Sequence, residues 1–307
     1  MQRAKTQFLE RISSLRQSLE IEAVTNKSLA EDLHNRVARL LRNGLAVVGF
    51  TALEDFLKSR TSEVLDSVGS SGVPFLSLPE KLRDATTHGA ISALAYQISI
   101  RTRSDRTTYV QEHAQKLAST ASTAYELTPH ALGYSQANLQ DQSIKEILKA
   151  FSIADPWGQM TALGSRLGLV ALPLDETFKS AALRRHRAAH VANADTPQND
   201  LKQFVNESLA IAMGFDWLIT TALKLLNTHD LGYIAGTTTP NVANMQIRSI
   251  RNHSGSWKEK LEHTARAVRV ATDRDELVPL ARVRAARNGD LLVVYSQNGE
   301  VEFWECC

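Results

Sequence analysis

Arg185, His186 and His190 are the residues whose types and spacing best fit a chemical role. Histidine titrates near neutral pH, so it can take a proton from a ribose 2′-hydroxyl or deliver one to a leaving 5′-oxygen. Arginine can hold a scissile phosphate through two parallel hydrogen bonds and stabilise the charge that develops on it. These residue types are therefore suited to cleaving RNA without a metal ion.

The five-residue separation of Arg185 and His190 limits what one copy of the segment can do. On an uninterrupted helix, the two side chains leave the axis about 140° apart. A single copy is thus an awkward site. Two copies that face each other across a two-fold axis can line one cleft with an arginine and a histidine from each subunit.

Spacing alone does not identify this site, because the chain has nine histidines and repeats the pattern elsewhere. Similar arginine–histidine separations occur at Arg83 and His88, Arg106 and His113, and Arg248 and His253. The context of the Arg185 copy distinguishes it from these three.

The segment Leu183–Asn193 resembles the signature of the HEPN superfamily, an arginine followed by Asn, His or Asp, three further residues and a histidine. In that family the motif ends a helix, and a loop and a closing amphipathic helix follow; Asp195–Asp200 and Leu201–Leu226 fit these parts. Gly44–Leu57 looks like the early helix of the family. Asp155–Gly168 resembles its RiboL-PSP branch, and the resemblance covers roughly residues 10–228.

This resemblance implies a homodimeric endoribonuclease that cuts single-stranded RNA at a composite site on the two-fold axis. It implies His190 in acid–base work, Arg185 in phosphate binding and His186 in a supporting polar contact, with no cofactor and no metal. It also implies a toxin role, often in antiphage defence, under the control of an antitoxin or another defence-system partner.

Several other interpretations of these residues stay open. Glu54 and Lys58 on the early helix are similar to a functional glutamate–basic motif of some HEPN branches, or form a surface i,i+4 pair. His186 and His190 could instead bind zinc, with Asp195 or Asp200 as a third ligand. A non-catalytic HEPN scaffold that binds RNA or a partner protein is the alternative function.

Further arginines could contact RNA phosphates. Arg184 and Arg187 flank the motif, and Arg101 and Arg103 form a local basic cluster. A solvated helix start explains the second cluster equally well.

The pattern predicts a mostly α fold, with a HEPN-like helical bundle over residues 1–228. Phe8, Ile12, Leu15 and Leu19 recur at helical spacing, and Ser28–Glu31 reads as a capping box before a long helix to about Val68. Shorter helices are expected over residues 79–98, 105–122, 141–153, 156–167 and 173–190, and Thr196–Pro197 opens the last long helix.

After the bundle, residues 229–256 read as a linker or irregular segment, and residues 257–307 as a small α+β domain. We expect a short helix over Trp257–Arg269. Three strands, Val278–Ala286, Asp290–Ser296 and Glu300–Glu305, would then form an antiparallel β-meander. Asn288–Gly289 and Asn298–Gly299 are typical of type I′ hairpin turns.

Composition excludes several classes of protein. A net charge of +2 gives no global attraction to nucleic acid or membrane, so RNA contact must be local. The chain has no phosphate-binding P-loop and no Rossmann glycine motif. Met1–Lys5 lead into a charged stretch rather than an apolar signal core, and Cys306 and Cys307 cannot staple a fold. We therefore expect a soluble, cytoplasmic protein.

Overall fold

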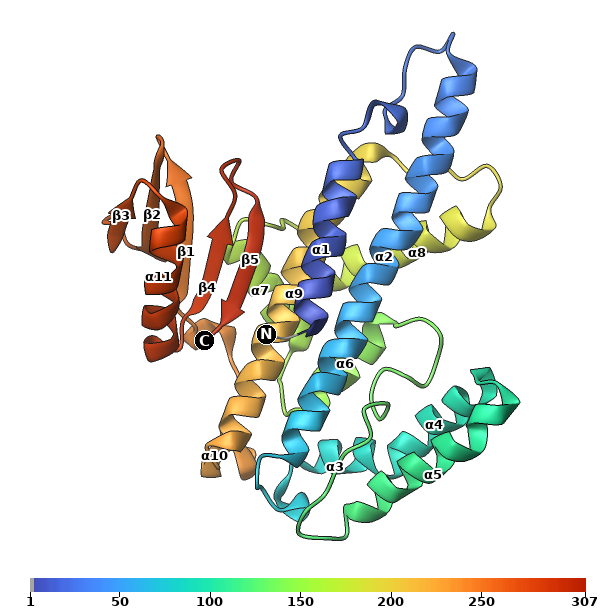
Figure 1. Ribbon diagram of the computed structural model, residues 1–307, viewed down its shortest axis with the longest axis vertical. Helices are drawn as coiled ribbons and strands as arrows, with labels where there is room; N and C mark the ends of the chain where they lie inside the picture. The colour runs from blue at the N-terminus through green and yellow to red at the C-terminus, as the bar shows by residue number, and fades with distance from the viewer. Residues whose placement is uncertain (1–2) are drawn as a thin grey trace. The chain divides into compact units, whose positions relative to one another are not determined.

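The computed structural model describes residues 3–307 and divides the chain into two compact units, one ending at Pro240 and the other spanning Asn241–Cys307 (Figure 1). The first unit is helical, and the second combines a sheet with one helix. Residues 229–256, expected to be a linker, instead contain a short helix and strand β1, so the sequence-based boundaries at 228 and 256 differ from the structural one.

The centre of the first unit is formed by two long helices, α2 (Asp32–Gly69) and α9 (Gln198–Asn227), together with α1 (Arg3–Ser18) (Figure 1). The predicted stripe on α1 is buried against α2, as its spacing of three and four residues requires. Most of α9 is buried on every side. Among the described residues it is the one helix apolar enough to cross a membrane, and 78% of its apolar window is enclosed by the protein, as in a central bundle helix.

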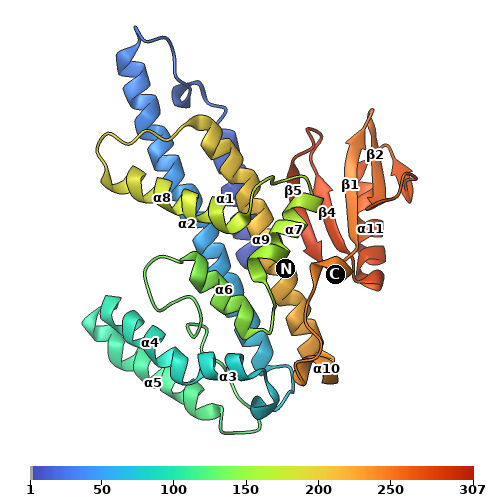
Figure 2. The ribbon, with the colours of Figure 1, turned by 180° about the vertical axis from the view of Figure 1, so that it is seen from behind.

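Seven further α-helices lie within residues 3–240, and several cover the other side of α2 and α9 (Figure 2). They are α3 (Glu80–Thr86), α4 (His88–Ile100), α5 (Arg103–Ser119), α6 (Asp141–Ala150), α7 (Pro156–Arg166), α8 (Leu174–His190) and α10 (Leu231–Ile234).

Two local predictions in this unit are wrong. The expected helix over residues 79–98 is two helices, because the backbone of Thr87 leaves the helical region at φ −112° and ψ −101°. The capping box at Ser28–Glu31 does not form. Glu31 itself is the N-cap of α2 and makes no side-chain capping bond.

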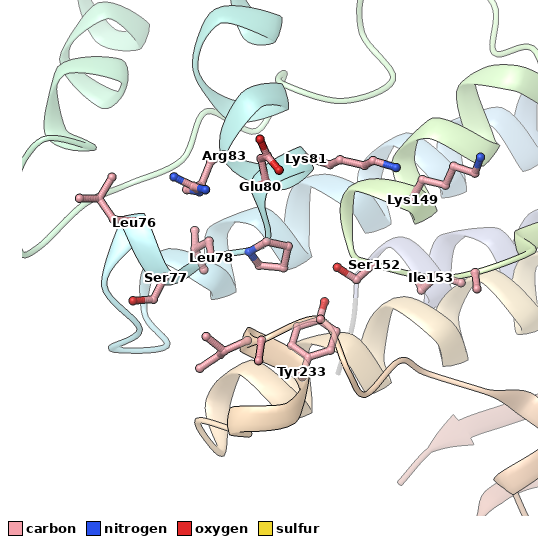
Figure 3. Close-up of a pocket in the computed structure, with 15 residues that line it drawn as sticks. Leu76, Ser77, Leu78, Glu80, Lys81, Arg83, Lys149, Ser152, Ile153 and Tyr233 are labelled. Atoms are coloured by element: carbon pink, nitrogen blue, oxygen red, sulfur yellow. The ribbon is translucent and has the colours of Figure 1, made fainter.

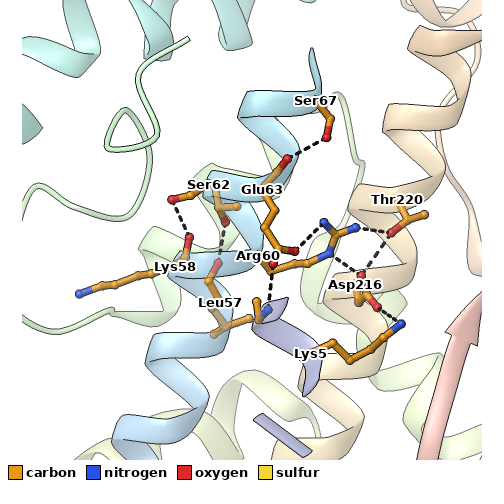
Figure 4. A network of polar contacts seen from close by, with 11 residues as sticks. Lys5, Leu57, Lys58, Arg60, Ser62, Glu63, Ser67, Asp216 and Thr220 are labelled. Atoms are coloured by element: carbon orange, nitrogen blue, oxygen red, sulfur yellow. Dashed lines mark hydrogen bonds and ion pairs between the residues drawn. The ribbon is translucent and has the colours of Figure 1, made fainter. Parts of the chain in front are cut away.

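A buried polar network joins α1, α2 and α9 (Figure 4). Asp216 of α9 is fully buried and accepts a hydrogen bond from Arg60 Nε at 2.7 Å. Lys5 Nζ lies 3.5 Å from the other carboxylate oxygen, and Arg60 also donates to Thr220 Oγ1 at 2.9 Å. Opposite charges removed from water in this way must be paired to be tolerated, so the network fixes how the three helices align.

The C-terminal unit is a five-stranded mixed sheet in the order β3-β2-β1-β4-β5 with helix α11 (Arg274–Asn288). The strands are β1 (Ile247–His253), β2 (Ser256–Leu261), β3 (Arg269–Ala271), β4 (Leu291–Tyr295) and β5 (Val301–Cys306). β1 and β4 are parallel, and the other pairs are antiparallel. Ile250, Leu292 and Val294 form a core with the apolar residues of α11.

The predicted three-stranded meander is therefore only partly present. The β4–β5 hairpin exists and turns at Asn298–Gly299. Val278–Ala286 is helical, because Leu277, Ala281 and Ala285 recur every four residues and are buried together. Gly289 is the left-handed C-cap of that helix, not a hairpin turn. The helix expected over Trp257–Arg269 is wrong, since Trp257 lies in β2.

A cluster of aromatic and histidine rings between α5 and the loop that follows it should make the free energy of unfolding depend on pH. Tyr109 Oη lies 2.8 Å from His130 Nδ1, and Thr128 Oγ1 lies 2.7 Å from His113 Nδ1. Burial, together with His113 and Arg101, lowers the pKa of His130 to about 4. Because the unfolded state binds the proton more readily, this contribution to stability is present above pH 6.5 and is lost as the pH falls towards 4.

We expect His130→Gln to destabilise the protein more at pH 7.5 than at pH 4.5. The two values should differ by about 1–2 kcal/mol, after allowing for the partial exposure of the ring. Urea unfolding of wild type and variant at both pH values measures this, with exposed His88→Gln as the control. An equal loss of stability at the two pH values would contradict the prediction.

Candidate active site

The candidate catalytic residues occupy the last two turns of α8. The helix carries Asp175 and Glu176 in its first turn, where negative charges interact favourably with the helix dipole. It ends at His190 because the backbone of Val191 is extended. The loop that follows is tied to α2 by the buried side chain of Arg42, which donates to Thr196 O at 2.8 Å and to Asp195 Oδ1 at 2.6 Å. The end of α8 is therefore held in a fixed place beside α2.

Arg185 lines a cleft of about 520 Å³ between α8, α2, α1 and the loop before α6. Glu54 and Lys58 of α2 line the same cleft, so the structure brings three of the sequence-predicted residues together. The Nε atom of Arg185 is enclosed and has no hydrogen-bond partner in the described chain. Buried polar atoms are usually hydrogen-bonded, so this unpartnered nitrogen is an unusual feature of the site.

Glu54 and Lys58 do not form the surface ion pair that their spacing allowed. Glu54 is buried and accepts a hydrogen bond from the backbone N–H of Leu139 at 2.6 Å. Lys58 Nζ donates to Ala137 O at 2.8 Å. Burial raises the pKa of the Glu54 carboxyl, which the Leu139 bond, Lys58 and Arg185 partly oppose. Burial likewise lowers the pKa of Lys58.

His186 and His190 lie on the exposed side of α8 and do not line the Arg185 cleft. Their ring centroids lie 4.8 Å apart, with the two ring planes tilted by 50°. Within residues 3–307 neither ring has a hydrogen-bond partner that would fix its tautomer. One chain therefore presents an arginine in a cleft and two histidines outside it.

The remaining basic candidates differ in how available they are. Arg184 is half-buried and lies 3.7 Å from Asp200, whereas Arg187 is exposed. Arg101 is half-buried over the ring of Tyr109, 3.9 Å from its centroid. Arg103 is exposed at the start of α5. The structure does not gather these four into one patch with the Arg185 cleft.

The zinc interpretation loses its third ligand. Asp195 pairs with Arg42, and Asp200 lies near Arg184. Over residues 3–307, no three His, Cys, Asp or Glu side chains are placed to hold a metal ion. Two of the other arginine–histidine pairs contain a buried member: Arg248 lies between Glu259 and Asp290, and His113 belongs to a buried ring cluster.

Comparison with known proteins now adds to this geometry. A family model described as RiboL-PSP-HEPN matches residues 7–216. The chain belongs to the RiboL-PSP-HEPN family. Searches of curated proteins and of solved structures returned no match.

The RiboL-PSP-HEPN match confirms the resemblance seen in the sequence and contains every residue of the Arg185 cleft. It ends within α9 and does not include the C-terminal sheet.

Sequence reasoning singled out Arg185, Glu54 and Lys58 but not the other residues that line this RiboL-PSP-HEPN cleft. Arg11 of α1 forms an ion pair with Asp55 of α2 at its edge, and Ala137 and Asn138 supply the loop wall. Asp55 adjoins Glu54 in the sequence, which is the one signal that could have indicated it. Arg11 and the loop lie far from the motif along the chain and carry no pattern.

Proposed function

We propose that this protein is a metal-independent endoribonuclease that cleaves single-stranded RNA at a site shared by two copies of the chain. Membership in a family with RNase-like function supports this proposal. The observation that carries it is the position of Arg185, which lines a cleft with Glu54 and Lys58 and belongs to the same two helical turns as His190.

The proposed reaction assigns a role to each residue. The ribose 2′-oxygen attacks the adjacent phosphorus as a histidine takes its proton, and the bond to the 5′-oxygen breaks as that oxygen is protonated. The products are a 2′,3′-cyclic phosphate and a 5′-hydroxyl. Arg185 binds the non-bridging oxygens, His190 transfers protons, and His186 makes a supporting contact. Exposed Arg187 and Arg103 would hold neighbouring phosphates, with smaller parts for Arg184 and Arg101.

Two copies are needed because the histidines do not line the cleft of their own chain. A two-fold partner that places its α8 opposite this cleft would add His186 and His190 to Arg185, Glu54 and Lys58. We therefore place the reaction between an arginine of one subunit and a histidine of the other.

The surface that would join the two copies is an apolar face of α2. Leu33, Val37, Leu40, Gly44 and Val48 follow one another at spacings of three and four, and Leu33 and Leu40 are 72% and 71% exposed. Contiguous exposed apolar patches often mark protein interfaces. Val48 also lines the Arg185 cleft, so the face is continuous with the incomplete site and a second copy is its proposed occupant.

We expect Leu33→Asp combined with Leu40→Asp to produce a monomer that does not cleave RNA, because four buried charges would oppose the interface. Light scattering measures the mass, and a gel assay measures cleavage. Arg39→Asp is the control, since it changes the charge equally on the opposite side of α2. If the double variant is still a dimer, the apolar face of α2 is not the dimer interface.

The function itself is tested with wild-type protein and a fluorescent single-stranded RNA in excess EDTA. We expect cleavage in EDTA, with product ends that polynucleotide kinase can phosphorylate at the 5′-hydroxyl. Loss of cleavage in EDTA would overturn the metal-independent mechanism and favour zinc. RNA binding without any cleavage would support the scaffold instead. Growth arrest on expression, relieved by a neighbouring gene product, is the expected sign of a toxin under partner control in antiphage defence.

A further inference from the structure

A second cleft lies apart from the Arg185 site, between α3, α6 and α10 (Figure 3). Its volume is about 710 Å³, within the range of small-molecule sites. Buried Leu78, Ile153 and Tyr233 line an apolar part of it, and the Tyr233 hydroxyl is already bonded to Phe151 O at 2.8 Å. The cleft shares no lining residue with the Arg185 cleft.

The charges around this cleft are mostly positive and unpaired. Lys81, Arg83 and Lys149 line it, against the single carboxylate of Glu80. None of the three cations has an ion-pair partner between residues 3 and 307, whereas Lys179 elsewhere lies within 4 Å of three carboxylates. The Nε atom of Arg83 is enclosed without a hydrogen-bond partner. An unsatisfied buried donor costs stability unless a ligand or water accepts a hydrogen bond from it.

Ser152 adds a strained residue at the same place. It follows the last turn of α6 with φ +57°, and Ile153 N donates back to Leu148 O at 3.1 Å, as at many helix ends. Glycine is favoured at such a position because a side chain is strained there. This chain has a serine instead, and its hydroxyl points into the cleft without a partner in the described chain (Figure 3).

We propose that this cleft binds a nucleoside phosphate. Lys81 and Lys149 come from facing helices on one side of the cleft and, with the Ser152 hydroxyl, would hold the phosphate (Figure 3). The apolar part accepts the flat base, and Arg83 on the other side can stack on it or donate to its edge. The ligand is either a free nucleotide or one nucleotide of an RNA chain. Binding of an RNA nucleotide rests on the proposed ribonuclease function, whereas binding of a free nucleotide does not.

The test is calorimetric titration of the full chain with adenosine 5′-monophosphate, adenosine and a short 2′-O-methyl RNA, which cannot be cleaved by 2′-hydroxyl attack. We expect adenosine to bind at least tenfold more weakly than its monophosphate. Lys81→Ala with Lys149→Ala should weaken binding of the monophosphate at least tenfold. Lys145→Ala, one turn earlier on α6 and outside the cleft, should leave it unchanged.

Ser152→Gly separates ligand binding from structure. The ligand-free variant should melt at a higher temperature, because glycine relieves the left-handed backbone, while its affinity for the monophosphate falls. Tighter binding of the RNA than of the monophosphate, lost in the lysine variant, would identify RNA as the source; the reverse order would identify a free nucleotide.

Equal binding by wild type and the lysine double variant would overturn the proposal, as would the absence of binding by both ligands. Arg185→Ala should not change binding of the monophosphate. If the protein binds the monophosphate but does not cleave RNA, the proposed ribonuclease function is contradicted and the proposed nucleotide site is not.

Discussion

Replacing His190 with alanine is expected to reduce the rate of RNA cleavage by about 10²–10⁴-fold, the usual contribution of a positioned acid or base. His190 is exposed at the end of α8, so its loss removes no core contact. Folding and the mass in solution should therefore stay as in wild type. Single-turnover cleavage of a labelled RNA measures the effect, and melting temperature and light scattering check the fold.

The matched control is His88→Ala. His88 is exposed on α4 and stands five residues after Arg83, the same separation as in the Arg185 motif. We expect no change in its cleavage rate. Wild-type cleavage by His190→Ala would show that the motif does not carry the reaction, and an equal loss in both variants would point to a general effect on the protein.

For the proposed dimer, mixing two variants tests whether the arginine of one subunit acts with the histidine of the other. A dimer of Arg185→Ala with His190→Ala keeps one arginine and one histidine on different chains. A dimer of wild type with the double variant keeps both on the same chain. Because His190 does not line the cleft of Arg185 in its own chain, we expect the first to be the more active. Higher activity of the second would place the whole site in one chain.

The motif and its surroundings were predictable because they depend on local order. A helix that ends at His190, a loop and a long apolar helix from Gln198 follow directly from periodicity and proline positions. The family resemblance singled out Glu54 and Lys58, but nothing in the sequence placed them beside Arg185. Spacing alone favoured a solvated Glu54–Lys58 pair equally, and it could not show that Leu139 caps the buried carboxylate.

The C-terminal unit was predicted less well, for a physical reason. Residues Ala281–Ala285 alternate in polarity over a short window, which imitates a strand, while the helical repeat of Leu277, Ala281 and Ala285 becomes evident only over nine residues. The parallel pairing of β1 with β4 joins segments separated by a helix. Buried Arg248 is held by Glu259 and Asp290, which short-range patterns do not connect.

Among the substitutions considered for stability, removal of the Asp216 carboxylate is expected to lower the free energy of unfolding most. Asp216 is fully buried, and it is the shared partner of Lys5 on α1 and Arg60 on α2 (Figure 4). Asp216→Ala leaves two enclosed cations facing each other without that carboxylate. Breaking a buried pair in this way costs about 3–5 kcal/mol of unfolding free energy. Glu63 reduces this loss of stability, because its carboxylate lies 3.3 Å from the Arg60 guanidinium and still pairs with it.

Urea unfolding measures this loss of unfolding free energy, and two further variants serve as comparisons. Asp216→Asn keeps an acceptor for Arg60 and should cost less than alanine, because only the charge is lost. Glu20→Ala removes an exposed partner of Lys202 and should cost at most about 1 kcal/mol. An alanine variant no less stable than the Glu20 variant would mean that the network does not hold α1, α2 and α9 together. Since α1 and α2 both line the Arg185 cleft, the alanine variant should also cleave RNA more slowly at temperatures where it is still folded.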